Sequence, residues 1–261
     1  MSLDELLLVT AGGIVVGFLG GYSGIGAAPV LVFVYGYFLG YTQHMAQGTV
    51  AAIMLGPLSL PAVIVMWDRV RCNLVFITIG LLTYAIFSYP GALLAYGLSH
   101  ETLRLAFAAF LLILGVRSVA MELVNGLSTA GVGTPDGRIR LNRFSMTLLG
   151  IVVGVAGGFF GIGAGVLMVP VMIWLFGVNK DDARAISLGI LLPPLSVGSV
   201  IKYQAHGDIV WPAMLVGLLA YMASNYFGAR LGRKHSTRRF NIVLGVLLLL
   251  MGLVYGKDLL F

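Results

Sequence analysis

Two glycine-rich stretches are the residues whose type and spacing point most directly to chemistry. They are GGYSGIG at 20–26 and GGFFGIG at 157–163, and each lies where two apolar segments join. Closely spaced glycines lower helix propensity, so we expect a helix to break at each stretch. In a membrane a broken helix is tolerated only where protein or a water-filled cavity satisfies the freed backbone groups. Short helices starting after Gly24 and Gly161 would point their N–H groups at a shared central site, which favours an anion.

The alternative is that these glycines only let helices pack closely, as small residues commonly do in membranes. The near-identical recurrence of the stretch in the second part of the chain favours the broken helices, because packing alone does not require the same spacing twice.

A small polar set follows each glycine stretch: Gln47-Gly48-Thr49 in the first case, and Arg184 with Ser187 in the second. Hydroxyls and an amide can hydrogen-bond an oxyanion without a fixed charge, although helix capping and interhelical hydrogen bonding explain them equally well. Arg184 either attracts an anion at the cytoplasmic mouth or is a solvated helix end beside Asp181 and Asp182. The predicted substrate-binding residues are Ser23, Gly24, Ile25, Gly26, Gln47, Gly48, Thr49, Gly161, Ile162, Gly163, Arg184 and Ser187.

The acidic residues all lie at the ends of apolar segments or in loops, so no buried carboxylate proton relay is evident. No nucleophile with its base and no metal-binding cluster converges, which argues against an enzyme and predicts no cofactor and no metal. The single cysteine, Cys72, cannot form an intrachain disulfide and is interpreted as a small apolar residue.

The elements that position these residues are apolar segments of membrane-spanning length. Hydrophobic residues make up 59% of the 261 residues and charged residues 10%, against roughly 25% charged in soluble domains. Such a composition excludes a water-soluble fold and predicts an all-α polytopic membrane protein. The net charge of +6 comes from basic residues at segment ends, not from a basic face interleaved with aromatics, so nucleic acid is not an expected partner.

The chain is an internal duplication. The sequences starting at Gly13 and Gly150 share 11 of 15 residues at an offset of 137, and the same offset pairs Pro57-Leu58-Ser59 with Pro194-Leu195-Ser196. We expect a first transmembrane repeat over residues 1–122, a cytoplasmic linker over 123–141, rich in Gly, Ser, Thr and Pro, and a second repeat over 142–261.

Each repeat contains five apolar segments. In the first repeat the third segment contains Pro57 and Pro61, and in the second repeat its partner contains Pro193 and Pro194, so both should be kinked. The segments run over 5–22, 25–40, 44–66, 73–96 and 101–121, then over 142–159, 162–177, 182–203, 210–232 and 238–256.

Five is an odd number, so the second repeat should start on the opposite face of the membrane and be inverted. This topology places 13 of the 16 Lys and Arg side chains on one face and leaves only Arg104, Lys202 and Lys257 on the other. By the positive-inside rule the rich face is cytoplasmic, which places both termini outside the cytoplasm in a multi-pass protein of the cell inner membrane.

The paired stretches GGYSGIGAAPVL (20–31) and GGFFGIGAGVLMVP (157–170) resemble the glycine-rich signature of the TauE/SafE family of sulfite exporters, also called the TSUP family. Ala46-Gln47-Gly48-Thr49 and the stretch from Ala183 to Leu188 are similar to its second signature. The likeness extends over essentially the whole chain. It implies that Gly24, Gly26, Thr49, Gly161, Gly163 and Ser187 line the substrate path.

Taken with that resemblance, the sequence predicts a permease or exporter for a small sulfur-containing anion, sulfite or an organosulfonate such as sulfoacetate, working by alternating access. The expected partners are this anion and the lipid bilayer, with a homodimer left open. A transporter of another small solute, for example an amine or a metal cation, and a scaffold subunit that does not transport are the alternatives.

Overall fold

The computed structural model describes residues 2–24, 27–127, 141–232 and 238–260, and within them every regular element is a helix. The helices of the first half are α1 (Leu3–Ser23), α2 (Ala28–Tyr37), α3 (Gln43–Leu55), α4 (Leu60–Val65), α5 (Trp67–Cys72), α6 (Leu74–Tyr96) and α7 (His100–Leu127). Those of the second half are α8 (Arg143–Phe160), α9 (Gly165–Trp174), α10 (Lys180–Ile190), α11 (Val197–Ala205), α12 (Trp211–Gly232) and α13 (Arg238–Leu260).

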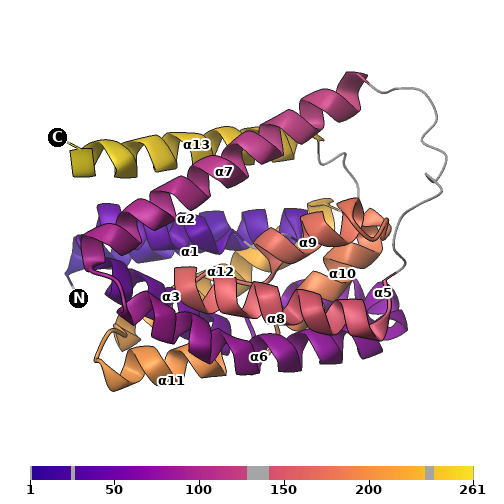
Figure 1. The fold of residues 1–261 in the computed structure, drawn as a ribbon, viewed down its shortest axis with the longest axis horizontal. Coiled ribbons are helices and arrows are strands. Elements are labelled where there is room, and N and C mark those ends of the chain that lie inside the picture. The colour runs from indigo at the N-terminus through magenta and orange to yellow at the C-terminus, as the bar shows by residue number, and fades with distance from the viewer. Residues whose placement is uncertain (1, 25–26, 128–140, 233–237, 261) are drawn as a thin grey trace.

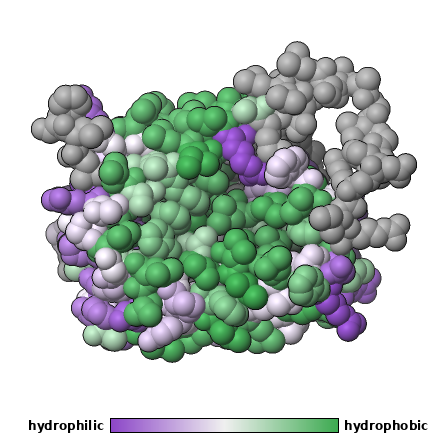
Figure 2. Space-filling model, viewed as in Figure 1, coloured by the Kyte–Doolittle hydropathy of each residue, from purple (hydrophilic) through white to green (hydrophobic). Residues whose placement is uncertain are grey.

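The surface of the described residues is that of a protein solvated by lipid. Within the part of the chain that the structure describes, four helices are long and apolar enough to cross a membrane: α1, α6, α8 and the 100–120 part of α7. Large apolar side chains face outward, including Ile86, Leu219 and Phe227. Figure 2 shows hydrophobic residues over the middle of the visible face. Polar residues such as Gln47 and Asn225 are buried instead. The prediction of an all-α polytopic membrane protein is confirmed.

The third segment of each half does not form one kinked helix, as the sequence analysis predicted, but two separate helices. In the first half α3 ends at Leu55 and α4 begins at Leu60, with Pro57 between them and Pro61 in the first turn of α4. In the second half α10 ends at Ile190 and α11 begins at Val197, with the proline pair between them. Proline removes a backbone donor and clashes with the preceding turn, so here it ends the helix.

Helices of one half pack mainly against helices of the other. Helix α1 lies along α12, α8 lies along α6, and α7 pairs with α13 beside this bundle (Figure 1). Glycines set these distances: a Cβ on Gly228 would clash with the carbonyl oxygen of Phe18, and one on Gly91 would clash with that of Val155. Close packing by small residues is therefore a real role of glycines in this fold.

Helices α7 and α13, which occupy corresponding positions in the two halves, point in opposite directions. Helix α7 starts at the end of the molecule that carries both termini, whereas α13 finishes there (Figure 1). Helix α7 also continues to Leu127, beyond the predicted end of the first repeat at residue 122. Most of the predicted linker, residues 128–140, lies outside the described residues.

Candidate functional site

Both glycine-rich helices end just before a glycine of their glycine-rich stretch. Helix α1 ends at Ser23, and Gly24 adopts the left-handed conformation with φ 68°. Helix α8 ends at Phe160, and Gly161 adopts the same conformation with φ 64°. Only glycine enters this region without strain from a Cβ atom, so the glycines end the helices here. Two predicted site residues, Ile25 and Gly26, lie outside the described residues.

The half-helices that follow these breaks start without a side-chain cap. Neither α2, which begins at Ala28, nor α9, which begins at Gly165, has a described side chain that accepts from its first-turn N–H groups. The next helix of each half is capped at equivalent positions: Thr42 accepts from the Met45 amide and Asn179 accepts from the Asp181 amide. The first turn of α9 therefore keeps more of its capacity to bind an anion than that of α10. In α2 the free donor of the first turn is the amide of Ala28, because Pro29 has no N–H and the amide of Val30 donates to the carbonyl oxygen of Ala27 at 2.9 Å.

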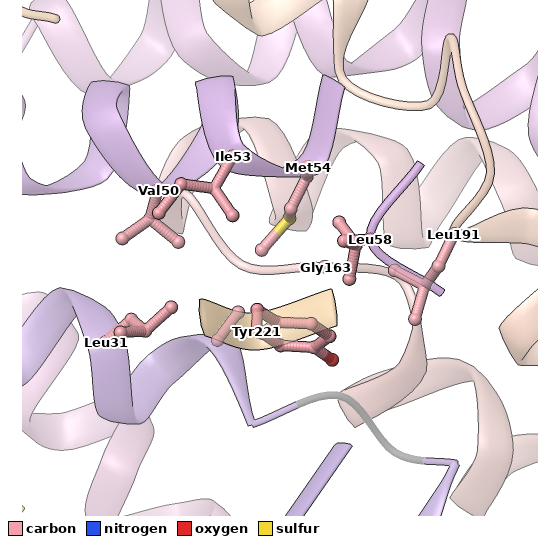
Figure 3. Close-up of a pocket in the computed structure, with 9 residues that line it drawn as sticks. Leu31, Val50, Ile53, Met54, Leu58, Gly163, Leu191 and Tyr221 are labelled. Atoms are coloured by element: carbon pink, nitrogen blue, oxygen red, sulfur yellow. The ribbon is translucent and has the colours of Figure 1, made fainter. Parts of the chain in front are cut away.

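A small cavity lies where the two breaks meet (Figure 3). Ala28 at the start of α2 and Gly163 just before α9 both line it, together with Val50 and Met54 of α3 and Tyr221 of α12. Its volume is about 10 Å³, which is room for a single water molecule. The remaining lining is apolar, from Leu31, Ile53, Leu58 and Leu191. In this conformation the centre of the protein is closed to a sulfonate.

The glycine that ends each helix packs against the polar residues at the start of the next-but-one helix of the other half. A Cβ on Gly161 would lie 2.6 Å from the Cβ of Gln47, and a Cβ on Gly24 would lie 2.8 Å from that of Arg184. Gln47 and Arg184 occupy equivalent positions at the offset of 137. The same crossed contact is thus made twice with different side chains.

Arg184 is buried, with 1% of its surface exposed, and it is not the solvated helix end considered in the sequence analysis. Its guanidinium donates to the carbonyl oxygens of Gly21 at 3.4 Å and of Tyr22 near the end of α1, and to that of Gly232 at the end of α12 at 3.2 Å. Asp181, on the same helix, lies 3.9 Å away. A cation beside two helix C-termini is stabilised by both helix dipoles, so Arg184 holds α1, α10 and α12 together.

Gln47 and its neighbours also bridge the two halves. The Tyr203 hydroxyl donates to Gln47 Oε1 at 3.0 Å and lies 3.3 Å from the carbonyl oxygen of Gly158. The amide of Val210 donates to the hydroxyl of Thr49 at 3.0 Å. A Cβ on Gly48 would clash with the carbonyl oxygen of Asp208, so the polar start of α3 packs directly against the segment between α11 and α12.

The remaining predicted site residues have backbone partners. Ser187 donates to the carbonyl oxygen of Gly24 at 2.9 Å, across the two halves, whereas Ser23 donates within its own helix to Leu19 at 2.7 Å. The carbonyl oxygen of Ile162 accepts from the Tyr84 hydroxyl at 2.6 Å. Among the described members of the predicted set, the structure places Gly163 in the wall of the central cavity. The side chains that make contacts between the halves are those of Gln47, Thr49, Arg184 and Ser187.

Two serines outside the predicted site, Ser59 and Ser196, make equivalent contacts between the halves. Ser59 donates to the carbonyl oxygen of Leu188 at 2.8 Å, and Ser196 donates to that of Ala51 at 2.7 Å. Both donors and both acceptors are related by the offset of 137. The identical Pro-Leu-Ser triplets were the signal in the sequence for this pair. The described residues contain no group of three or more His, Cys, Asp or Glu side chains that could hold a metal ion.

Comparison with known proteins agrees with this architecture. Residues 9–255 match the family described as sulfite exporter TauE/SafE. A probable membrane transporter protein of Methanocaldococcus jannaschii is 26% identical over 272 residues, which cover 97% of this chain and 95% of the relative. One of Xylella fastidiosa is 24% identical and covers 95% and 94% of the two chains. One of Bacillus subtilis is 35% identical over 108 residues, 40% of this chain and 38% of the relative.

Proposed function

The chain belongs to the sulfite exporter TauE/SafE family and is a multi-pass membrane transporter, not an enzyme, and from this premise we propose that it moves a small sulfur-containing anion across the cell inner membrane. Sulfite or an organosulfonate such as sulfoacetate is the proposed substrate. Both termini lie outside the cytoplasm in this proposal, because the opposite face carries most of the Lys and Arg residues.

The observation that carries the anion preference is the pair of half-helix starts at one cavity. Ala28 opens α2 and Gly163 precedes α9, both line the same space, and neither helix has a side-chain cap among the described residues. Two helix N-termini directed at one point add their positive dipole ends. A sulfonate or sulfite group offers several acceptor oxygens to such N–H groups, as phosphates do at other helix N-termini.

Transport requires the closed cavity to open to each side in turn. Two observations support an inverted repeat: α7 and α13 run in opposite directions, and the two halves make equivalent hydrogen bonds to each other. In such a repeat, rocking of one half against the other alternates access. The Ser59–Leu188 and Ser196–Ala51 hydrogen bonds are equivalent contacts that such a motion would break and remake one at a time.

The driving force in this proposal is the membrane potential. Every carboxylate whose burial the structure describes is exposed or partly exposed, so none of these is placed to carry a proton through the core. An inside-negative potential expels an anion by about 2.3 kcal/mol per charge per 100 mV. Export driven by that potential follows without a coupling ion.

Flux into proteoliposomes tests this proposal. Purified protein is reconstituted, a potassium gradient with valinomycin sets the potential, and uptake of labelled sulfoacetate and of sulfite is measured against protein-free vesicles. We expect uptake that grows as the interior is made more positive and that persists without a pH gradient. Uptake that ignores the potential and requires a proton gradient would overturn the driving force. Failure to move any sulfonate, sulfite or related anion would overturn the substrate class and favour another solute or a scaffold.

A further inference from the structure

Two histidines contact each other at the end of the molecule that carries both termini. His44 lies in the first turn of α3 and is 4% exposed, whereas His100 is the first residue of α7 and is exposed. Their Nδ1 atoms are 2.6 Å apart. His100 also lines a pocket of about 160 Å³ that it shares with Gln43 and Tyr255. Protons from the solvent therefore reach the buried His44 through His100.

The contact fixes where the hydrogen atoms of this pair lie. His44 Nε2 is 3.1 Å from the carbonyl oxygen of Ala95, which can only accept, so this nitrogen carries a hydrogen. When His44 is neutral its Nδ1 is then an acceptor, and the Nδ1–H of His100 donates to it. After one proton is added, the Nδ1–H of either imidazolium still donates to the Nδ1 of the other ring. After two, both Nδ1 atoms carry a hydrogen and the contact is lost.

The pair belongs to a cluster that joins the two halves. The ring of Tyr96 on α6 stacks on His44, with ring centres 4.6 Å apart, and its hydroxyl donates to Asp208 Oδ2 at 2.5 Å. His206 stacks on the same Tyr96 ring at 4.0 Å. Asp208 and His206 lie between α11 and α12, so this cluster connects α3, α6 and α7 with the second half.

The other groups around the pair do not titrate in the range of histidine. The charged neighbours are Glu101 and Arg104 on α7, Lys202 on α11, and Glu5 of α1 beside Tyr41. The remaining titratable neighbours are tyrosines, with an ordinary pKa of about 10: Tyr35, Tyr41, Tyr203 and Tyr255. Between about pH 5 and 8 the change of charge in this cluster therefore comes from its histidines.

The equivalent positions of the duplication carry no histidine. At the offset of 137, His44 corresponds to Asp181, His100 to Thr237 and His206 to Arg69. Arg69 forms an ion pair with Asp182 at 3.1 Å, which links α5 with α10. Arginine and aspartate keep their charges between about pH 5 and 8, whereas histidine does not. Among these matched positions, the pH-sensitive ones all lie at the end that carries the termini.

Helix α3 connects the histidine pair with the central cavity. Its first turn holds His44 and also Gln43, which lines the pocket at this end. Farther along the same helix, Val50 and Met54 line the central cavity. A shift of the start of α3 away from α7 would therefore widen the gap between this pocket and the centre of the protein.

We propose that His44 and His100 form a proton-binding site that locks the extracytoplasmic end of the path. With at most one added proton, the pair holds α3 against α7 and this end stays closed. A second proton separates the two rings and releases the start of α3. Acid favours the open conformation, because that conformation binds one more proton than the closed one. The consequence for transport, that acid outside the cell opens the anion path, rests on the proposed function.

Labelling of an engineered cysteine near the pair measures this opening. In a Cys72→Ser background, Gln43→Cys places a thiol where the original side chain is 4% exposed, and Phe38→Cys places one where it is 57% exposed. The ratio of their labelling rates with a water-soluble maleimide removes the dependence of thiol reactivity on pH that both share. We expect this ratio to rise about tenfold or more from about pH 8 to about pH 5. An unchanged ratio would overturn the lock.

His100→Asn separates the pair from the rest of the cluster. The asparagine amide offers both a donor and an acceptor, so it can pair with His44 in either protonation state and does not bind the second proton. In this variant the labelling ratio should stay low at both pH values. His206→Asn is the matched control and should keep the rise, because His206 contacts Tyr96 from the other side. A rise that persists in His100→Asn, or disappears in His206→Asn, would overturn the proposal.

Ala183→Cys distinguishes opening from unfolding in acid. Ala183 is fully buried near the start of α10, at the other end of the molecule (Figure 1). Its thiol should stay unreactive at both pH values. Labelling there in acid would attribute the change at residue 43 to unfolding and would overturn the lock.

Nitrogen NMR of the protein labelled in its histidines observes the bond itself. We expect a coupling between the two Nδ1 atoms at about pH 8 and its loss at about pH 5. Its absence at the higher pH would overturn the proposed pairing. No substrate enters these experiments. They can therefore fail while anion transport stands, and they can succeed while proteoliposome flux fails.

Discussion

Gly24 of the first half lies directly against Arg184 of the second, so close that a Cβ on the glycine would stand 2.8 Å from that of the arginine. The equivalent contact, between Gly161 and Gln47, is slightly closer, at 2.6 Å. A left-handed glycine thus serves two purposes at each break: it ends a helix, and it lets a helix of the other half approach.

Alanine at these two glycines should destabilise the protein more than alanine at a glycine with the same backbone but open surroundings. Gly40 is that control, with φ 68° and no atom within 4 Å of an added Cβ. Gly40→Ala should lose about 1–2 kcal/mol from the left-handed strain alone. Gly24→Ala and Gly161→Ala should lose about 1–3 kcal/mol more from the clash. Thermal unfolding in detergent ranks the three, and equal losses would contradict a close contact.

Replacement of Arg184 should lower the stability of the protein more than it changes the affinity for substrate. Arg184→Ala leaves carbonyl oxygens of α1 and α12 without their donor, at about 1–3 kcal/mol for each buried group left unpaired. Arg184→Lys keeps the charge but offers a single point of donation, so it should be intermediate. Unfolding temperature and transport KM are measured together. A large rise in KM at unchanged unfolding temperature would instead place Arg184 in the anion site.

Gly163→Ala should impair transport without unfolding the protein. The added methyl would lie 3.0 Å from Leu191 Cδ2 and 3.3 Å from Met54 Sδ, at the wall of the central cavity. Both neighbours are flexible side-chain ends that can yield, so the stability loss should stay below about 1.5 kcal/mol. Proteoliposome flux should fall at least tenfold. Gly256→Ala, where nothing lies within 4 Å of the new methyl, is the control and should transport normally.

Cys72 can report the orientation of the chain in the membrane. It is exposed at the end of α5, and it is the single cysteine of the sequence, so no engineered label is needed. A membrane-impermeant maleimide should label it in inverted vesicles and not in right-side-out spheroplasts, because this end belongs to the predicted cytoplasmic face. Cys72→Ser gives the background. Labelling in intact spheroplasts would reverse the proposed orientation.

Much of the architecture could be predicted from the sequence, because its signals are local. Runs of apolar residues predict the helices, and glycine clusters predict the breaks after Ser23 and Phe160, which depend on backbone conformation alone. The offset of 137 predicts which segments are equivalent. The prediction of a kink in each proline-containing third segment is wrong, because the energies of a kink and of a full helix break differ through packing against other parts of the chain.

Only the tertiary structure determines which residues come together in a site and which pair with the other half. Gln47, Thr49 and Ser187 are polar and follow the breaks, as expected, yet each is used in a hydrogen bond to the other half. Conversely, Gln43 and Tyr255 stand 212 positions apart and share one pocket only because α3 and α13 meet at the same end of the molecule. The residue type determines what a side chain is able to bind. Its actual partner depends on which helices pack together, and helix packing is determined by contacts between residues far apart in the sequence.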